Sequence, residues 1–250
     1  MKKIIASNWK EYIKTPAEAQ EILDFTNDFL ESRGESTEGS LIFCPSFELI
    51  DPVANLLKKS HLEHESFLGI QDLRNDINIE RIIQSGVGYV IIGHSDRRWK
   101  DGESNEITNG KLKESLKKEL IPIVCLGEKS RDDNFKIFIE NQIDGTFSGL
   151  DADQIEKCII TYEPVWAISV TPGSEPDNPD NAVQKINFIK EALISKFEIT
   201  PKNYFLYGGS VNSDNILDFL SKEEINGVLI GRASTDKEEF VKILSETYKI

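Results

Sequence analysis

The sequence is short of positive charge and of cysteine, and it has no long apolar run. It contains 29 Lys and Arg residues against 43 Asp and Glu residues, which gives a formal net charge of −14. This balance disfavours binding to the phosphate backbone of nucleic acids and to anionic membrane surfaces. It does not exclude a small anionic substrate, because a few local cations or helix N-termini are enough to bind one.

The three cysteines, Cys44, Cys125 and Cys158, each lie inside an apolar run and show no CxxC spacing. We interpret them as small core residues in a reducing compartment, and not as disulfide partners or zinc ligands. No apolar run reaches membrane-spanning length, and the opening stretch MKKIIASNWK lacks the small-residue cleavage pattern of a signal peptide. We therefore expect a cytoplasmic protein without a membrane partner.

Eight short runs rich in apolar and β-branched residues recur along the chain: IIAS, LIFC, SFLGI, GYVIIG, IPIVCLG, KCIITY, NYFLYG and GVLIG. Most are apolar throughout, which is typical of strands buried on both faces of a parallel sheet. After the first run, Thr15 and Glu18 form a capping-box pattern around Pro16, which suits the first helical position. Apolar residues then recur with helical spacing. The expected stripes after the first, sixth and eighth runs are Ile22, Phe25 and Phe29; Val183, Ile186, Ile189 and Leu193; and Phe240, Ile243 and Leu244.

Eight strand-then-helix units in 250 residues favour an α/β fold of the (β/α)₈ barrel type over a doubly wound sheet. Because the chain has no linker or break in composition, we expect a single domain over residues 1–250. The third unit is unusual, since only DLRNDIN separates the strand SFLGIQ from the short helix ERIIQS. We interpret Asp101 to Glu106 and Lys111 to Lys118 as solvated helix faces.

In such barrels the reactive groups lie at the C-terminal ends of the strands and in the loops that follow. A carboxylate desolvated at a buried strand end, as Glu163 would be, can act as a base near neutral pH. A neutral His94 could donate a hydrogen bond to a carbonyl oxygen, and Lys10 could stabilise the oxyanion that forms. Gly209 and Gly231 would let backbone N–H groups approach an anion closely.

Each of these residues taken alone has an ordinary structural explanation. Lys10 could be a solvated surface lysine, His94 a hydrogen-bonded structural residue, and Glu163 a helix cap or an ion-pair partner. Their joint placement at strand ends favours a catalytic site. By contrast, His61 and His64 have a spacing that could bind a metal on a helix, but no third ligand is evident, so we expect no metal site there.

At these positions the sequence resembles the triosephosphate isomerase family. SNWK resembles the family's NWK motif, IIGHSDRR its GHSERR motif, and YEPVWAI its YEPVWAIG signature. YGGSV is identical to the seventh-strand motif, PIVCLGE matches the fifth-strand motif, and GVLIGRAS is similar to GxLVGGAS. The matches extend from Asn8 to Ser234, which is nearly the whole chain.

The resemblance implies interconversion of dihydroxyacetone phosphate and D-glyceraldehyde 3-phosphate through an enediol(ate), without metal or cofactor. It implies that Glu163 is the base, that His94 is a neutral electrophile, and that Lys10, helped by Asn8, stabilises the oxyanion; these are the roles assigned in the family. It also implies that the loop after Glu163 closes as a lid. The residues expected to bind the substrate phosphate are Ser169, Gly209, Ser210, Gly231 and Arg232, with Asp96 and Tyr207 in supporting positions.

Four features depart from the family pattern. Ser169 to Gly173 replace the glycine-containing lid GTGKT, and Asp96 replaces a glutamate. Arg232 replaces a glycine, and the arginine side chain could either add a cation for the phosphate or point outward. The loop after Gln71 is shorter than in the family and lacks the TGE motif that docks into the partner subunit of the homodimer. We therefore expect a monomer or a different dimer, and turnover below the family norm. Two alternatives are an isomerase of another small phosphorylated ketose, and a barrel that binds phosphorylated ligands without useful turnover.

Overall fold

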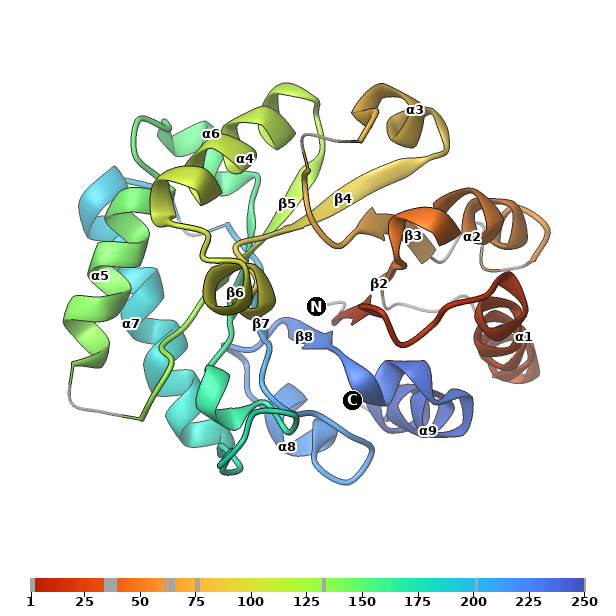
Figure 1. Ribbon diagram of the computed structural model, residues 1–250. Helices are drawn as coiled ribbons and strands as arrows, with labels where there is room; N and C mark the ends of the chain where they lie inside the picture. Colours follow the sequence, from red (N-terminus) through yellow and green to blue (C-terminus); the bar gives the residue numbers. More distant parts are fainter. Residues whose placement is uncertain are drawn as a thin grey trace.

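The computed structural model describes residues 3–33, 40–60, 62, 66–74, 77–131, 134–200 and 202–249. Its eight strands form one closed parallel barrel in chain order, and β1 pairs with both β2 and β8 (Figure 1). The strands are β1 (Ile4–Asn8), β2 (Ser40–Cys44), β3 (Ser66–Ile70), β4 (Val87–Ile92), β5 (Ile121–Leu126), β6 (Ile159–Tyr162), β7 (Phe205–Tyr207) and β8 (Gly227–Ile230). The predicted (β/α)₈ barrel is confirmed, because each of the eight apolar runs overlaps one strand.

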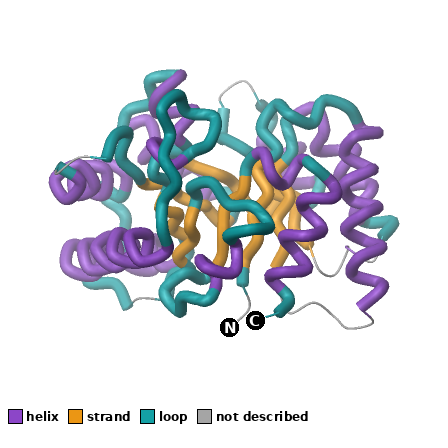
Figure 2. Tube along the Cα trace, turned by 90° about the horizontal axis from the view of Figure 1, so that it is seen from below, coloured by secondary structure: helices purple, strands orange, loops and turns teal. Residues whose placement is uncertain are grey.

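Helices surround the strands in Figure 1, and Figure 2 shows them on both sides of the barrel. They are α1 (Pro16–Arg33), α2 (Ile50–Leu57), α3 (Ile79–Gln84), α4 (Asn105–Lys117), α5 (Phe135–Thr146), α6 (Ala152–Glu156), α7 (Pro179–Phe197), α8 (Ile216–Leu220) and α9 (Lys237–Thr247). Single turns of 3₁₀- or π-helix follow four strands: η1 (Phe47–Leu49), η3 (Asp96–Lys100), η4 (Val165–Ala167) and η5 (Arg232–Thr235). None of the helices in the described ranges is long and apolar enough to cross a membrane.

Helix α1 begins where the sequence predicts and buries a slightly different face. The Glu18 backbone N–H donates to Thr15 Oγ1 at 3.2 Å and the Thr15 N–H donates to Glu18 Oε2 at 3.1 Å, so the capping box is confirmed. The prediction of a buried apolar stripe is wrong at Phe25, whose side chain is 41% exposed and lies beneath the ammonium of Lys237. The buried face instead comprises Ala19, Ile22, Leu23, Thr26 and Leu30. The stripe of α9 is buried as predicted, and so is that of α7 apart from the partly buried Val183.

Most strand residues are buried on both faces of the sheet, which explains the apolar runs; Phe67 of β3, which is 45% exposed, is an exception. In β5, Ile123 and Cys125 belong to the cluster inside the barrel, whereas Val124 and Leu126 pack outward with the helices. The three cysteines are free and buried, as predicted for core residues. Since most side chains of both faces are committed to packing, most of the polar groups available for chemistry lie at the strand ends and in the loops.

The connection between β3 and α3 is fastened to α4 by a buried ion-pair cluster. Lys111 Nζ lies 2.6 Å from Asp72 Oδ1 and also pairs with Glu103, and the Lys111 side chain is only 16% exposed. The prediction of a solvated face over Lys111 to Lys118 is therefore wrong at Lys111, because its two partners come from other segments. Part of this connection, Asn75 and Asp76, lies outside the described residues, as do His61 and His64.

Candidate active site

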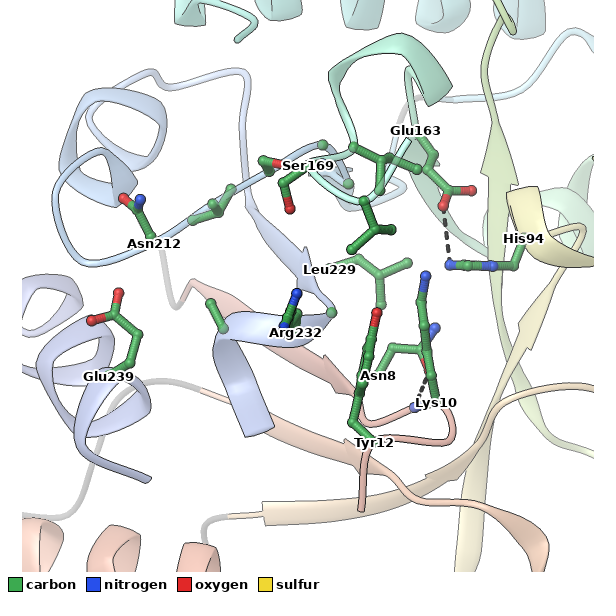
Figure 3. Close-up of a pocket in the computed structure, with 18 of the residues that line it drawn as sticks. Asn8, Lys10, Tyr12, His94, Glu163, Ser169, Asn212, Leu229, Arg232 and Glu239 are labelled. Carbon is green, nitrogen blue, oxygen red and sulfur yellow. Dashed lines mark hydrogen bonds and ion pairs between the residues drawn. The ribbon is translucent and has the colours of Figure 1, made fainter. Parts of the chain in front are cut away.

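The residues predicted for the site meet at the C-terminal end of the barrel, around a cavity of about 460 Å³. Five strands or the loops after them contribute: β1, β4, β6, β7 and β8. Figure 3 shows Glu163 and His94 pointing toward one another, with Lys10 extending toward the same space and Arg232 further along the wall. The predicted residues that line the cavity are Asn8, Lys10, His94, Glu163, Ser169, Gly209, Ser210, Gly231 and Arg232.

Glu163 follows β6 directly, and its side chain is almost completely buried. Its Oε2 accepts a hydrogen bond from the Ser95 backbone N–H at 2.8 Å, and its Oε1 accepts one from the Ser95 hydroxyl at 2.7 Å. His94 Nε2 lies 3.0 Å from the same Oε1. Both oxygens therefore accept hydrogen bonds from the protein, and Oε1 accepts from two donors.

His94 is held as a neutral imidazole. Its Nδ1 accepts a hydrogen bond from the Asp96 backbone N–H at 3.1 Å, so the ring proton is on Nε2, which faces Glu163. Burial lowers the pKa of His94; Glu163 opposes this shift, and the charge of Lys10 adds to it. The imidazole can thus donate one hydrogen bond into the site without carrying charge.

Lys10 has an unusual backbone conformation for a lysine. It occupies the second position of a turn closed by the Tyr12 N–H and the Trp9 carbonyl, with φ of +47°. A residue other than glycine in this left-handed region costs about 1–3 kcal/mol and persists only where its surroundings hold it. Asn8 Oδ1 accepts from the Lys10 N–H at 3.2 Å, and the Gln71 side-chain amide donates to the Lys10 carbonyl at 2.9 Å.

The ammonium of Lys10 is fixed by a carboxylate, with Nζ 3.0 Å from Asp96 Oδ2. The other oxygen of Asp96 pairs with Lys100 at 2.7 Å. Burial opposes ionisation of Asp96, but His94 and the two lysines outweigh it and hold the pKa of Asp96 below its ordinary value. The shorter carboxylate at this position therefore still reaches the lysine.

The opposite wall of the cavity is formed by the loops after β7 and β8. A Cβ on Gly209 would lie 2.1 Å from the hydroxyl of Tyr207, so only glycine allows the loop to pass this close. Tyr207 is buried and stacks on Phe219 with ring centroids 4.2 Å apart. A Cβ on Gly231 would make only an ordinary contact with Lys10, at 3.7 Å. Tyr207 thus supports the loop from below and does not line the cavity.

Arg232 lies on the cavity wall, at the start of η5. Its guanidinium carbon is 5.9 Å from the centre of the Tyr12 ring, and within the described ranges it has no carboxylate oxygen within 4.0 Å. Asp236 and Glu239 line the same cavity, but Asp236 caps α9 and Glu239 accepts hydrogen bonds from Ser213. The guanidinium is therefore available to an anionic ligand.

Two sets of side-chain contacts fasten the first half of the loop after Glu163. The Trp166 indole N–H and the Tyr162 hydroxyl both donate to Glu128 Oε1, at 2.7 and 2.9 Å. Further along, the Ser169 N–H donates to Ser210 Oγ at 2.7 Å. The first contact anchors the start of the loop, and the second brings its middle next to the loop after β7.

Two residues of this arrangement, Gln71 and Glu128, were not predicted for the site. Each follows the C-terminal end of its strand, β3 or β5, with at most one residue between, which is the same positional signal that identified the others. The described residues contain no group of three or more His, Cys, Asp or Glu side chains placed to hold a metal ion.

Comparison with known proteins identifies the family of the chain. A family model described as triosephosphate isomerase matches residues 3–247. The chain belongs to the triosephosphate isomerase family. It is 36% identical to the triosephosphate isomerase of Aquifex aeolicus (strain VF5), over 98% of this chain and 99% of that protein.

A second triosephosphate isomerase, that of Carboxydothermus hydrogenoformans, is 35% identical over 97% of this chain and 98% of its own length. The crystal structure of triosephosphate isomerase from Bartonella henselae superposes with a TM-score of 0.81 at 27% identity, covering all of both chains. The activity that comes with the family is that of triosephosphate isomerase, and its substrate is a triose phosphate.

Proposed function

We propose that Glu163 carries the proton between two adjacent carbons of a triose phosphate, interconverting dihydroxyacetone phosphate and D-glyceraldehyde 3-phosphate through an enediol(ate). The observation that supports this best is the 3.0 Å contact of Glu163 Oε1 with a neutral His94, beside the ammonium of Lys10. A base, a neutral hydrogen-bond donor and a cation are the three groups needed to remove a proton next to a carbonyl and stabilise the oxyanion.

In this reaction the carboxylate leaves Ser95, which donates a hydrogen bond to each of its oxygens, and turns toward the substrate carbon. His94 Nε2–H donates to the substrate oxygen that gains negative charge and afterwards exchanges a proton with it. Lys10 stabilises the same charge, with Asn8 fixing the lysine backbone. No step in this sequence requires a metal or a cofactor.

The substrate phosphate would lie against the loops after β7 and β8. Gly209 and Gly231 would offer backbone N–H groups there, and Arg232 adds a cation. Ser210 and Ser169 border the same wall, but the Ser210 N–H already donates to the Ala167 carbonyl at 3.1 Å, so Ser210 would contribute its hydroxyl group. A phosphate bound at this wall places the carbonyl end of a three-carbon substrate near Lys10 and His94. Closure of the lid over this wall would exclude water from the reactive intermediate.

The test is Glu163→Asp, which withdraws the carboxylate by one methylene. Turnover of both triose phosphates, followed in dehydrogenase-coupled assays, is expected to fall about 10²-fold or more because the reacting atoms are misplaced by roughly 1 Å. Glu175→Asp, the same change at an exposed lid carboxylate, serves as the matched control and should retain activity. Equal effects of the two changes, or faster turnover of a four-carbon ketose phosphate, would contradict the proposal.

The expected oligomeric state rests on the short connection after Gln71. We expect a monomer or a dimer that does not use residues 72–79, and sedimentation at micromolar concentration tests this. The low turnover expected from the sequence stays a prediction, with no support from the structure. The cytoplasm, which is typical of the family, is the expected compartment.

A further inference from the structure

The backbone of Lys10 is held in place by a side chain that has no part in the chemistry described above. The Gln71 amide Nε2 donates two hydrogen bonds, to the Lys10 carbonyl at 2.9 Å and to the Cys44 carbonyl at 3.1 Å. Gln71 follows β3 and Cys44 ends β2, so the amide ties the turn after β1 to the ends of two neighbouring strands.

This tie acts on the strained residue itself. Lys10 has a φ of +47°, a region that side-chain-bearing residues seldom occupy, and its carbonyl orientation is part of that conformation. The Trp9 N–H also donates to the Cys44 carbonyl, at 3.1 Å, so one acceptor is shared by the turn and by Gln71. A change of φ at Lys10 would break the Gln71 bond and carry Nζ away from Asp96.

We infer that Gln71 is a positioning residue for the isomerisation, which keeps Lys10 in its left-handed conformation and its ammonium aimed at the substrate oxygen. The inference rests on the proposed role of Lys10 as oxyanion stabiliser. Gln71 also begins the short connection that the Asp72–Lys111 ion pair fastens to α4. The chain therefore supplies, from its own third loop, a fixed support for the catalytic lysine.

The main test is Gln71→Met, which keeps the length of the side chain and removes both donors. Because a displacement of about 1 Å at a reacting group can cost 10²-fold, we expect kcat to fall about 10- to 100-fold while KM changes by less than about threefold. A crystal structure of this variant should show Lys10 outside the left-handed region or Nζ displaced from Asp96.

The matched control is Asn203→Leu. The Asn203 amide also donates to two backbone carbonyls, those of Ile155 and Cys158, at 2.7 and 2.9 Å, but it precedes β7 at the opposite end of the barrel. Its loss should lower the melting temperature about as much as Gln71→Met does and leave kcat unchanged. Equal kcat values in the two variants would overturn the inference.

A second variant covers the case in which Gln71→Met does not fold. Gln71→Asn keeps the amide but is one methylene too short to reach both carbonyls, and it should show an intermediate loss of kcat. An Asn variant with native kcat would also refute the inference. If the native chain turned over no triose phosphate, the proposed function would fail first; if it is active and Gln71 variants keep its kcat, only this inference fails.

Discussion

Replacing Lys111 with methionine should destabilise the protein far more than the loss of an ordinary surface lysine. The side chains of Lys111, Asp72 and Glu103 are 16, 6 and 11% exposed, so the change leaves two carboxylates buried without their cation. Removing one partner of a buried ion pair typically costs about 3–5 kcal/mol of unfolding free energy. At about 2–4 °C per kcal/mol for a chain of this size, the melting temperature should fall by roughly 6–20 °C.

The matched control is Lys118→Met, at the C-cap of the same helix. Lys118 pairs with Glu80 of α3, but the two side chains are 26 and 62% exposed, and such a pair is worth about 1 kcal/mol or less. Urea unfolding of the two variants gives the comparison. Adding Asp72→Asn and Glu103→Gln to Lys111→Met should recover most of the loss, because no buried charge remains. Equal destabilisation by the two lysine changes, or no recovery, would refute this reasoning.

Three further predictions concern the site. Glu128→Leu leaves the donors of Trp166 and Tyr162 unpaired. At about 1–3 kcal/mol per buried donor, urea unfolding should show a loss of about 2–6 kcal/mol in unfolding free energy. A loss below about 0.5 kcal/mol, which is roughly the scatter of surface changes, would contradict this. Arg232→Gly should raise KM about tenfold and leave kcat nearly unchanged if the guanidinium binds the phosphate, whereas an unchanged KM would show that it does not. Because burial lowers the pKa of His94, the unfolded chain binds a proton at this residue more readily than the folded chain does below about pH 6.5. The unfolding free energy should therefore fall as the pH drops through that range. His94→Asn should make this decline shallower.

The fold could be predicted because its signals are local. Strands covered on both faces need apolar side chains at consecutive positions, and that requirement is visible in runs such as IIAS and IPIVCLG. The start of α1 was equally visible, since a capping box depends on two residues three positions apart, Thr15 and Glu18. The strand-end rule then placed Lys10, His94 and Glu163 around one cavity without knowledge of any contact.

What the sequence could not supply depends on partners distant in the chain. Lys111 has the spacing of a solvated helix face, and only the fold brings Asp72, 39 positions earlier, to its ammonium. Phe25 continues an apolar stripe, yet the face that packs inward is set by the orientation of α1 on the barrel. The Ser95 bonds that hold the carboxylate of Glu163 likewise depend on where β4 and β6 end relative to one another.

At Lys10 the left-handed backbone conformation lowers the stability of the fold, whereas the proposed catalytic role requires a lysine at this position. Glycine adopts this conformation at no steric cost, so backbone energetics alone favour glycine over lysine there. A screen for thermostable variants would therefore tend to select the substitution that removes the cation proposed to stabilise the oxyanion. Position 10 is one that directed evolution of this chain should hold constant while the rest of the barrel is varied.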